Sequence, residues 1–157
     1  MDRYDWSRLN RLQLGRYAEY LVKMEFTLFG FDVYTAEVDD KGIDFVVRKE
    51  YEDEEGKVGY RYYDVQVKSV RGLSYIFFQK AKFAIRDNLL AAVVIFENSE
   101  LPRIHLIRAT AWKLPNALFV GRDYEGLESK PEWGLNLSRK NLPLLEPYEF
   151  DRVAWQL

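Results

Sequence analysis

The chain has 157 residues, and its 23 basic and 25 acidic side chains leave a formal net charge of −2. Apolar residues make up 48% of it, which is enough to bury a sizeable core, and the absence of cysteine excludes disulfide bonds and thiolate metal sites. The N-terminus lacks the apolar stretch of a secretory signal, and no apolar run is long enough to cross a bilayer. We therefore expect a cytoplasmic protein that does not contact membranes.

The charges are unevenly distributed along the chain. The segment Glu50–Glu55 holds five acids and no base, and removing it alone would make the remainder positively charged. The stretch Val65–Arg86 contains no acid, and its basic residues are Lys68, Arg71, Lys80, Lys82 and Arg86. One face can therefore be basic although the whole chain is not, the alternative being an ordinary mixed surface.

The N-terminal half predicts one helix followed by strands. Apolar residues recur at helical spacing over Asp5–Phe29, and Gly30 stands where a helix C-cap belongs, so we predict one long amphipathic helix. A polar turn at Asp39–Gly42 and a loop at the acidic segment separate the predicted strands, which are Phe31–Val38, Ile43–Glu50 and Tyr60–Val70.

The second half predicts a buried strand and then short elements. Ser74–Arg86 is ambiguous, since its first residues favour a strand and its last a helix. Leu89–Glu97 is a nearly continuous apolar run, typical of a strand covered on both faces, and Arg103–Arg108 is a further strand. From Ala111 onward frequent proline and glycine predict short elements and turns. No linker or repeat interrupts the chain, which indicates one domain over residues 1–157.

Several polar residues stand out within these predicted strands. Asp64, Gln66 and Lys68 are spaced by two, so they share one face of the strand. Asp44 lies at the start of the preceding strand. If the two strands pair as a hairpin, counting equal lengths back from the loop places Asp44 opposite the Gln66–Lys68 end. An acid, an amide oxygen and an ammonium group then converge at one edge of the sheet.

Glu19 lies on the apolar side of the predicted helix. Within about 60° of it around the helix axis are Leu12, Gly15, Val22 and Phe26. Burying a carboxylate without a partner is costly, so Glu19 should face a cation, a hydrogen-bond donor or a metal. A slightly rotated helix would instead leave it at the surface. His105, within the alternating segment RIHLIR, is expected to have a structural role.

The acid on the first helix (GRYAEY), the acid at a strand start (GIDFVV) and the Q-x-K strand (VQVKS) together resemble the PD-(D/E)XK nuclease superfamily. The chain is most similar to members that end this strand in QVK, which are bacterial domains of unknown function and intron-associated endonucleases. The resemblance covers Gln13–Arg71. It implies an α/β, restriction-endonuclease-like fold, with a mixed β-sheet and the long N-terminal helix packed on one face.

The resemblance also implies roles for individual residues. Asp44 and Gln66 would bind Mg²⁺, or Mn²⁺ in its place, and Lys68 would position or activate the attacking water. Glu19 would be a supplementary ligand from the helix. Asp64, on the face that carries Gln66, is a candidate for the carboxylate that position 66 lacks.

Two departures from the family pattern stand out. Gly42 and Ile43 precede Asp44 where the motif has a proline, and Gln66 replaces the commoner carboxylate. An amide oxygen can still ligate a hard cation, although it adds no negative charge.

The sequence thus predicts a metal-dependent nuclease that hydrolyses phosphodiester bonds in DNA. Its nucleic-acid-binding residues are expected to be Arg71, Lys80, Lys82 and Arg86. One alternative is an inactive nuclease-fold domain that binds nucleic acid or a protein partner. Another is an unrelated α/β interaction module with a coincidental motif, and the formation of a homodimer is left open.

Overall fold

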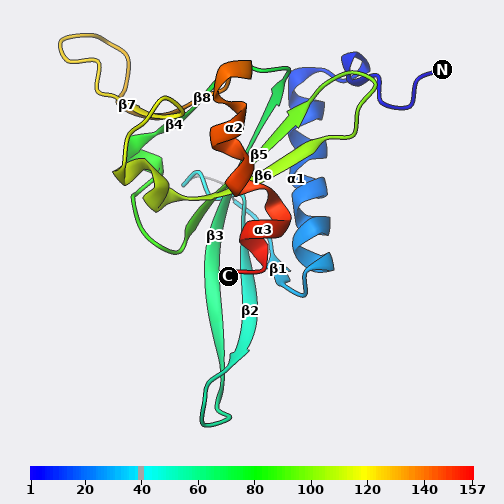
Figure 1. Ribbon diagram of the computed structural model, residues 1–157, viewed down its shortest axis with the longest axis vertical. Helices are drawn as coiled ribbons and strands as arrows, with labels where there is room; N and C mark the ends of the chain where they lie inside the picture. The colour runs from blue at the N-terminus through cyan, green and yellow to red at the C-terminus, as the bar shows by residue number, and fades with distance from the viewer. Residues whose placement is uncertain (39–40) are drawn as a thin grey trace.

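The computed structural model describes residues 1–38 and 41–157, and Figure 1 shows its α/β architecture. The strands are β1 (Asp32–Tyr34), β2 (Phe45–Glu52), β3 (Val58–Arg71), β4 (Tyr75–Gln79), β5 (Leu89–Phe96), β6 (Arg103–Arg108), β7 (Phe119–Arg122) and β8 (Glu132–Asn136). Within the described residues they form a five-stranded sheet, in the order β1-β2-β3-β5-β6, and a three-stranded sheet, in the order β4-β8-β7. Only β3 and β5 pair in parallel there, which makes the larger sheet mixed.

The helices are short apart from the first. They are α1 (Arg11–Leu28), α2 (Leu142–Leu145) and α3 (Phe150–Ala154), with 3₁₀ turns η1 (Trp6–Arg8), η2 (Lys80–Lys82), η3 (Ala109–Lys113), η4 (Arg139–Asn141) and η5 (Glu146–Tyr148). Within the described ranges, no helix combines the length and apolar character needed to cross a lipid bilayer.

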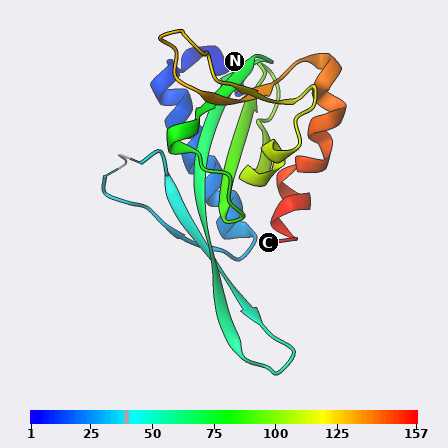
Figure 2. The same cartoon turned by 90° about the vertical axis from the view of Figure 1, so that its left-hand side faces the viewer.

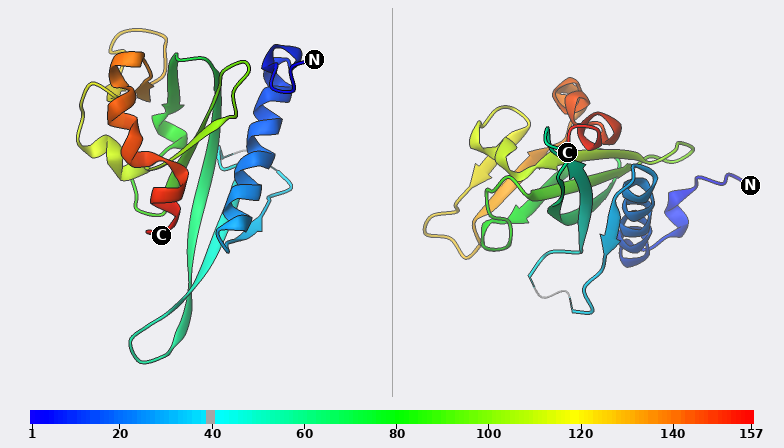
Figure 3. Two further views of the ribbon diagram at one scale, coloured as in Figure 1. Left: turned by 45° about the vertical axis from the view of Figure 1, so that its right-hand side comes forward. Right: turned by 90° about the horizontal axis from the view of Figure 1, so that it is seen from below.

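The predicted start of the first helix at Asp5 is wrong. Asp5 caps the separate turn η1, and α1 begins at Arg11. Asn10 fixes this start through a capping box, in which the Gln13 backbone N–H donates to Asn10 Oδ1 and the Asn10 N–H donates to Gln13 Oε1, both at 2.9 Å. Helix α1 then packs on one face of the larger sheet, as Figure 3 shows. It buries Leu14, Ala18, Val22 and Phe26 in the first of two hydrophobic cores.

The first strand is shorter than predicted. Only Asp32–Tyr34 pairs with β2, so the prediction of a strand over Phe31–Val38 is wrong at both ends. Of the predicted turn, Asp39 and Asp40 lie outside the described residues, while Gly42 has the positive φ of 78° that favours glycine.

Strands β2 and β3 form a long antiparallel hairpin that projects from the body of the molecule (Figures 1 and 2). The acidic segment supplies its tip, where Asp53 Oδ1 accepts from the backbone N–H of Lys57 at 2.8 Å and Gly56 takes a φ of 81°. Strand β2 begins and ends two residues later than predicted, but the predicted hairpin pairing is confirmed.

The ambiguous segment Ser74–Arg86 resolves into a strand and a single 3₁₀ turn. Strand β4 takes its first part, and η2 is the only helical turn in the second. Although β4 follows β3 after a short turn, it belongs to the second sheet. The chain leaves the larger sheet at Gly72, whose φ is 69° and whose N–H donates to the Phe96 carbonyl at 2.8 Å.

Strand β5 divides the interior into two cores, as its apolar sequence predicts. All eight of its residues are buried. Leu90, Ala92, Val94 and Phe96 join the first core, with α1 and α3. Leu89, Ala91, Val93 and Ile95 join the second core, between the two sheets. The C-terminal third consists of short strands, turns and helices, which confirms that prediction.

His105 makes folding stability sensitive to pH. Its side chain is 6% exposed, and Nδ1 has no hydrogen-bond partner among the described residues. Burial, assisted by the charge of Arg103, lowers the pKa of His105 from 6.5 to about 4. Between these values the unfolded chain binds the proton more tightly, so stability should decrease as the pH falls through this range. We expect a loss of about 2 kcal/mol between about pH 7.5 and about pH 5.

Urea unfolding at both pH values checks this prediction, with His105→Gln as the matched variant. His105 is the only histidine in the chain, so the difference between the two proteins isolates its titration from that of the carboxylates. Equal pH dependence in both proteins would show that His105 is protonated as readily when folded as when unfolded.

Candidate active site

The hairpin register brings Asp44 next to the polar face of β3. Phe45 pairs with Val65, so Asp44, one residue earlier, lies across from Gln66. Two hydrogen bonds fix it there. Its backbone N–H donates to the Val65 carbonyl at 2.9 Å, and its Oδ2 accepts from the backbone N–H of Val67 at 2.6 Å. This is the placement that equal strand lengths predict.

Gln66 presents a buried carbonyl oxygen at this point. Its side chain is 8% exposed, and Oε1 has no hydrogen-bond partner among the described residues. Gln66 pairs with Ala91, which places its side chain on the second-core face of the sheet. A buried acceptor without a donor typically costs about 1–3 kcal/mol, so such an atom calls for an explanation such as local strain, a catalytic role, or a bound water or ion.

Lys68 lies two residues further along the same face and is partly buried. Burial is the main cause that lowers its pKa, the Asp44 carboxylate opposes this, and Arg11 and Lys82 lower the pKa further. Its Nζ lies 5.7 Å from the ring centroid of Phe78. Among the residues that the structure describes, no carboxylate lies within salt-bridge distance of the Lys68 side chain.

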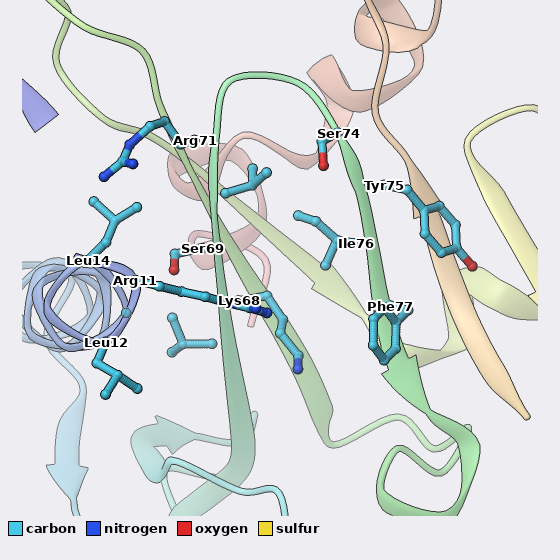
Figure 4. A pocket seen from close by; sticks show the side chains of 13 residues that line it. Arg11, Leu12, Leu14, Lys68, Ser69, Arg71, Ser74, Tyr75, Ile76 and Phe77 are labelled. Carbon is cyan, nitrogen blue, oxygen red and sulfur yellow. The ribbon is translucent and has the colours of Figure 1, made fainter. Parts of the chain in front are cut away.

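A cavity of about 600 Å³ opens beside Lys68. It lies between the first turns of α1, the end of β3 and the start of β4 (Figure 4). Arg11 extends from α1 toward Lys68 in this view, and Arg71 lies at another side of the cavity. Of the three candidate residues, Lys68 lines this hollow, together with Arg11 and Arg71, whereas Asp44 and Gln66 are not among the lining residues.

Glu19 is not among the residues that line this cavity. Its side chain is 15% exposed, and its carboxylate lies 3.1 Å from Lys23 Nζ and 3.3 Å from a guanidinium nitrogen of Arg16. The prediction that Glu19 faces a cation is confirmed. Because both cations come from its own helix, a metal is not required to neutralise it.

Asp64 is also neutralised by a neighbour. It forms a salt bridge with Arg86, which donates in addition to Asn88 Oδ1 at 2.6 Å. The negative charge of Asp64 is therefore balanced by Arg86. In this structure the Asp64 carboxylate contacts that guanidinium group and does not join the oxygens of Asp44 and Gln66.

The four predicted nucleic-acid-binding residues do not form one continuous basic strip. Lys80 Nζ contacts Asp123 at 2.7 Å, and Arg71 donates to the carbonyls of Trp6 and Leu9 at 2.9 and 2.7 Å. Arg86 is paired with Asp64, whereas Lys82 lowers the pKa of Lys68 and Arg71 lines the same cavity as Lys68.

Arg11 is the site residue that sequence reasoning missed. Its position follows from the start of α1, which the capping box at Asn10 sets. The sequence NRLQ carries that signal, an asparagine followed by glutamine three residues later. This signal predicts that Arg11 lies in the first turn of the helix.

The donor set at this site suits a hard cation held in part by its substrate. In the part of the chain that the structure describes, no group of three or more acidic or histidine side chains could hold a metal ion. Mg²⁺ keeps several waters and is commonly bound by one or two carboxylates together with substrate phosphates. The Asp44 carboxylate and the buried Gln66 Oε1 fit that requirement.

Comparison with known proteins finds no match to this chain, either among protein-family models or among curated proteins.

Proposed function

We propose that this chain is a metal-dependent nuclease that hydrolyses phosphodiester bonds in DNA. The observation that carries the proposal is the buried Oε1 of Gln66, which has no hydrogen-bond partner among residues 1–38 and 41–157. Gln66 lies across the β-ladder from Asp44 and two residues from the partly buried Lys68. The oxygens of Gln66 and Asp44 can ligate a hard cation, which promotes phosphodiester hydrolysis, and the Lys68 ammonium group can stabilise the charge that develops.

The topology supports a restriction-endonuclease-like fold. A long helix packs on one face of a mixed sheet, an acid stands at the start of β2, and the Q-x-K sequence lies on β3. Strand β5 then pairs in parallel with β3, next to the candidate residues. A mixed sheet with the long N-terminal helix packed on one face is what the resemblance implies for this superfamily.

Each side chain has a distinct role in the proposed reaction. Asp44 and Gln66 would hold the metal through oxygen atoms. When bound, Mg²⁺ polarises a phosphoryl oxygen and lowers the pKa of a bound water. Lys68 would hold the attacking water or stabilise the negative charge that develops on the phosphorus-bound oxygens. Arg11 and Lys82 increase the positive potential around the same point.

A cleavage assay on the intact chain tests the proposal. Purified protein is incubated with single- and double-stranded DNA and RNA in Mg²⁺, in Mn²⁺ and in EDTA. Cleavage that requires a divalent cation and is strongest on DNA is expected. Tight DNA binding without cleavage in either metal would instead support the inactive nuclease-fold alternative.

Gln66→Glu is expected to increase metal affinity. The substitution adds a negative charge where the buried oxygen lies, and carboxylates bind hard cations better than neutral amides do. Without metal the buried carboxylate should destabilise the fold, and Mn²⁺ should restore its stability. Isothermal titration of Mn²⁺ into wild type, Gln66→Glu and Gln66→Ala measures the affinities, and thermal unfolding with and without Mn²⁺ measures the rescue.

Gln66→Ala is the matched control, since it removes the oxygen without adding charge and should bind Mn²⁺ more weakly than wild type. If the three titrations coincide, position 66 does not contact the metal.

A further inference from the structure

The cavity beside Lys68 lies between two strands that are consecutive in the chain but do not pair. Strand β3 is joined to β4 by the turn at residues 72–74, yet β3 belongs to the larger sheet and β4 is the edge strand of the smaller one. On the side away from β5, the ladder between β2 and β3 ends at Val65, and within the described residues no strand covers Val67–Arg71 there. The two strands diverge around a hollow, as Figure 4 shows.

The backbone of β3 contributes polar groups to this hollow. Successive residues of a strand direct their N–H groups to opposite edges. The N–H of Asp64 donates toward β5, to the Asn88 carbonyl, and that of Val67 donates away from β5, to Asp44. The N–H of Ser69, two residues beyond Val67, therefore lies on the edge that borders the cavity.

The side chains around the cavity differ between its walls. Arg11, Lys68 and Arg71 supply positive charge, and none of the described residues that line the cavity is acidic. The opposite wall carries Phe77, whose side chain is 47% exposed and whose ring centroid lies 5.9 Å from Lys68 Nζ. An exposed aromatic ring beside a cationic group provides a surface for a base next to a position for a phosphate.

We propose that this cavity receives one unstacked nucleotide, with its phosphate near Arg11 and Lys68 and its base against Phe77. The substrate of the proposed nuclease is then single-stranded DNA, or a strand with an unpaired segment, rather than the interior of an intact duplex. This inference rests on the proposed function, because it takes the phosphate at Lys68 to be the one that is cleaved.

The size and position of the cavity support this assignment. Lys68 forms part of the cavity wall, so a nucleotide whose phosphate contacts Lys68 extends into the hollow. A volume of about 600 Å³ suits a small organic ligand such as one nucleotide, whereas a base within a duplex remains stacked and paired. An extended peptide could also add to an open strand edge, but the cationic lining favours a phosphate.

Binding without catalysis tests the inference. A short fluorescein-labelled DNA single strand and the blunt duplex of the same sequence are titrated with the intact protein in EDTA at one salt concentration, and fluorescence anisotropy gives each affinity. The single strand is expected to bind about tenfold more tightly. Phe77→Ala should weaken single-strand binding by about fivefold to a hundredfold, the range found when one stacking ring is removed, and should leave duplex binding nearly unchanged.

Two further variants sharpen the comparison. Phe77→Leu keeps an apolar side chain without the aromatic face and should lose most of the same affinity. Tyr20→Ala removes an exposed ring from α1 outside the cavity and should bind like wild type. A single-strand preference that survives both Phe77 variants would overturn the inference, as would equal or tighter binding to the blunt duplex. Binding of a polyglutamate peptide with neither oligonucleotide bound would assign the cavity to a peptide instead.

The inference and the proposed function can fail separately. A protein that shows the Phe77-dependent preference in EDTA but cleaves nothing in Mg²⁺ or Mn²⁺ contradicts the nuclease proposal alone. A protein that cleaves both DNA forms equally, with binding indifferent to Phe77, contradicts only the single-strand inference.

Discussion

Replacing Lys68 with alanine is expected to slow DNA cleavage by about two to three orders of magnitude, the usual cost of removing one group that stabilises transition-state charge. The fold should tolerate the change. Burial lowers the pKa of Lys68, which means that the folded protein disfavours its charge, and within the described residues no salt bridge is lost with it. Single-turnover cleavage rates and urea unfolding measure the two effects.

Lys57→Ala is the matched control, because this lysine lies in the exposed segment at the tip of the β2–β3 hairpin. It removes the same charge and should cleave like wild type. If Lys68→Ala cleaves as fast as this control, Lys68 has no part in the reaction. The pH dependence adds a second check. Because its pKa is lowered, a role for protonated Lys68 predicts that activity declines as the pH rises, below the pH at which an ordinary lysine titrates.

Asp44→Ala and Asp44→Asn should both reduce cleavage by orders of magnitude but should differ in stability. Alanine leaves the backbone N–H of Val67 without the acceptor that it has at 2.6 Å, which is expected to cost about 1–3 kcal/mol. Asparagine keeps an acceptor oxygen and removes only the negative charge, so it should unfold close to wild type. Its loss of cleavage then reports on the charge that holds the metal.

The comparison between Asp44→Ala and Asp44→Asn separates the contribution of Asp44 to folding stability from its contribution to cleavage. Asp32→Asn, which alters an exposed carboxylate paired with Arg48 on the neighbouring strand, is a control for removing one acid. Cleavage by Asp44→Asn at the wild-type rate would show that the carboxylate charge is not used and would remove Asp44 from the proposed site.

The elements best predicted from the sequence are those whose pattern of apolar and polar residues fits only one type of secondary structure. Leu89–Glu97 has no polar residue before its end, and it forms a strand that is buried on both faces. The spacing of Asp44, Gln66 and Lys68 within a hairpin fixes their relative positions, because the ladder advances by equal lengths on its two strands. The convergence of these three residues was predictable for that reason.

The remaining features depend on contacts between distant segments. The second sheet pairs β4 with β8, which are more than fifty residues apart, and nothing local in Ser74–Arg86 indicates that pairing. The partners of the basic residues are equally remote. Lys80 meets Asp123 on a loop of the second sheet, and Arg71 is held by carbonyls near the N-terminus. A count of charges along the chain could not show which of them are neutralised.

Strand β5 also has a consequence for how the chain unfolds. Neighbouring residues such as Ala91 and Ala92 belong to different cores, so the strand is the common boundary of both. If one core loses its packing, β5 becomes exposed on that side, and the other core loses the rigid surface against which it is packed. Neither sheet should therefore melt alone, and heat or denaturant should remove the two together in one cooperative step.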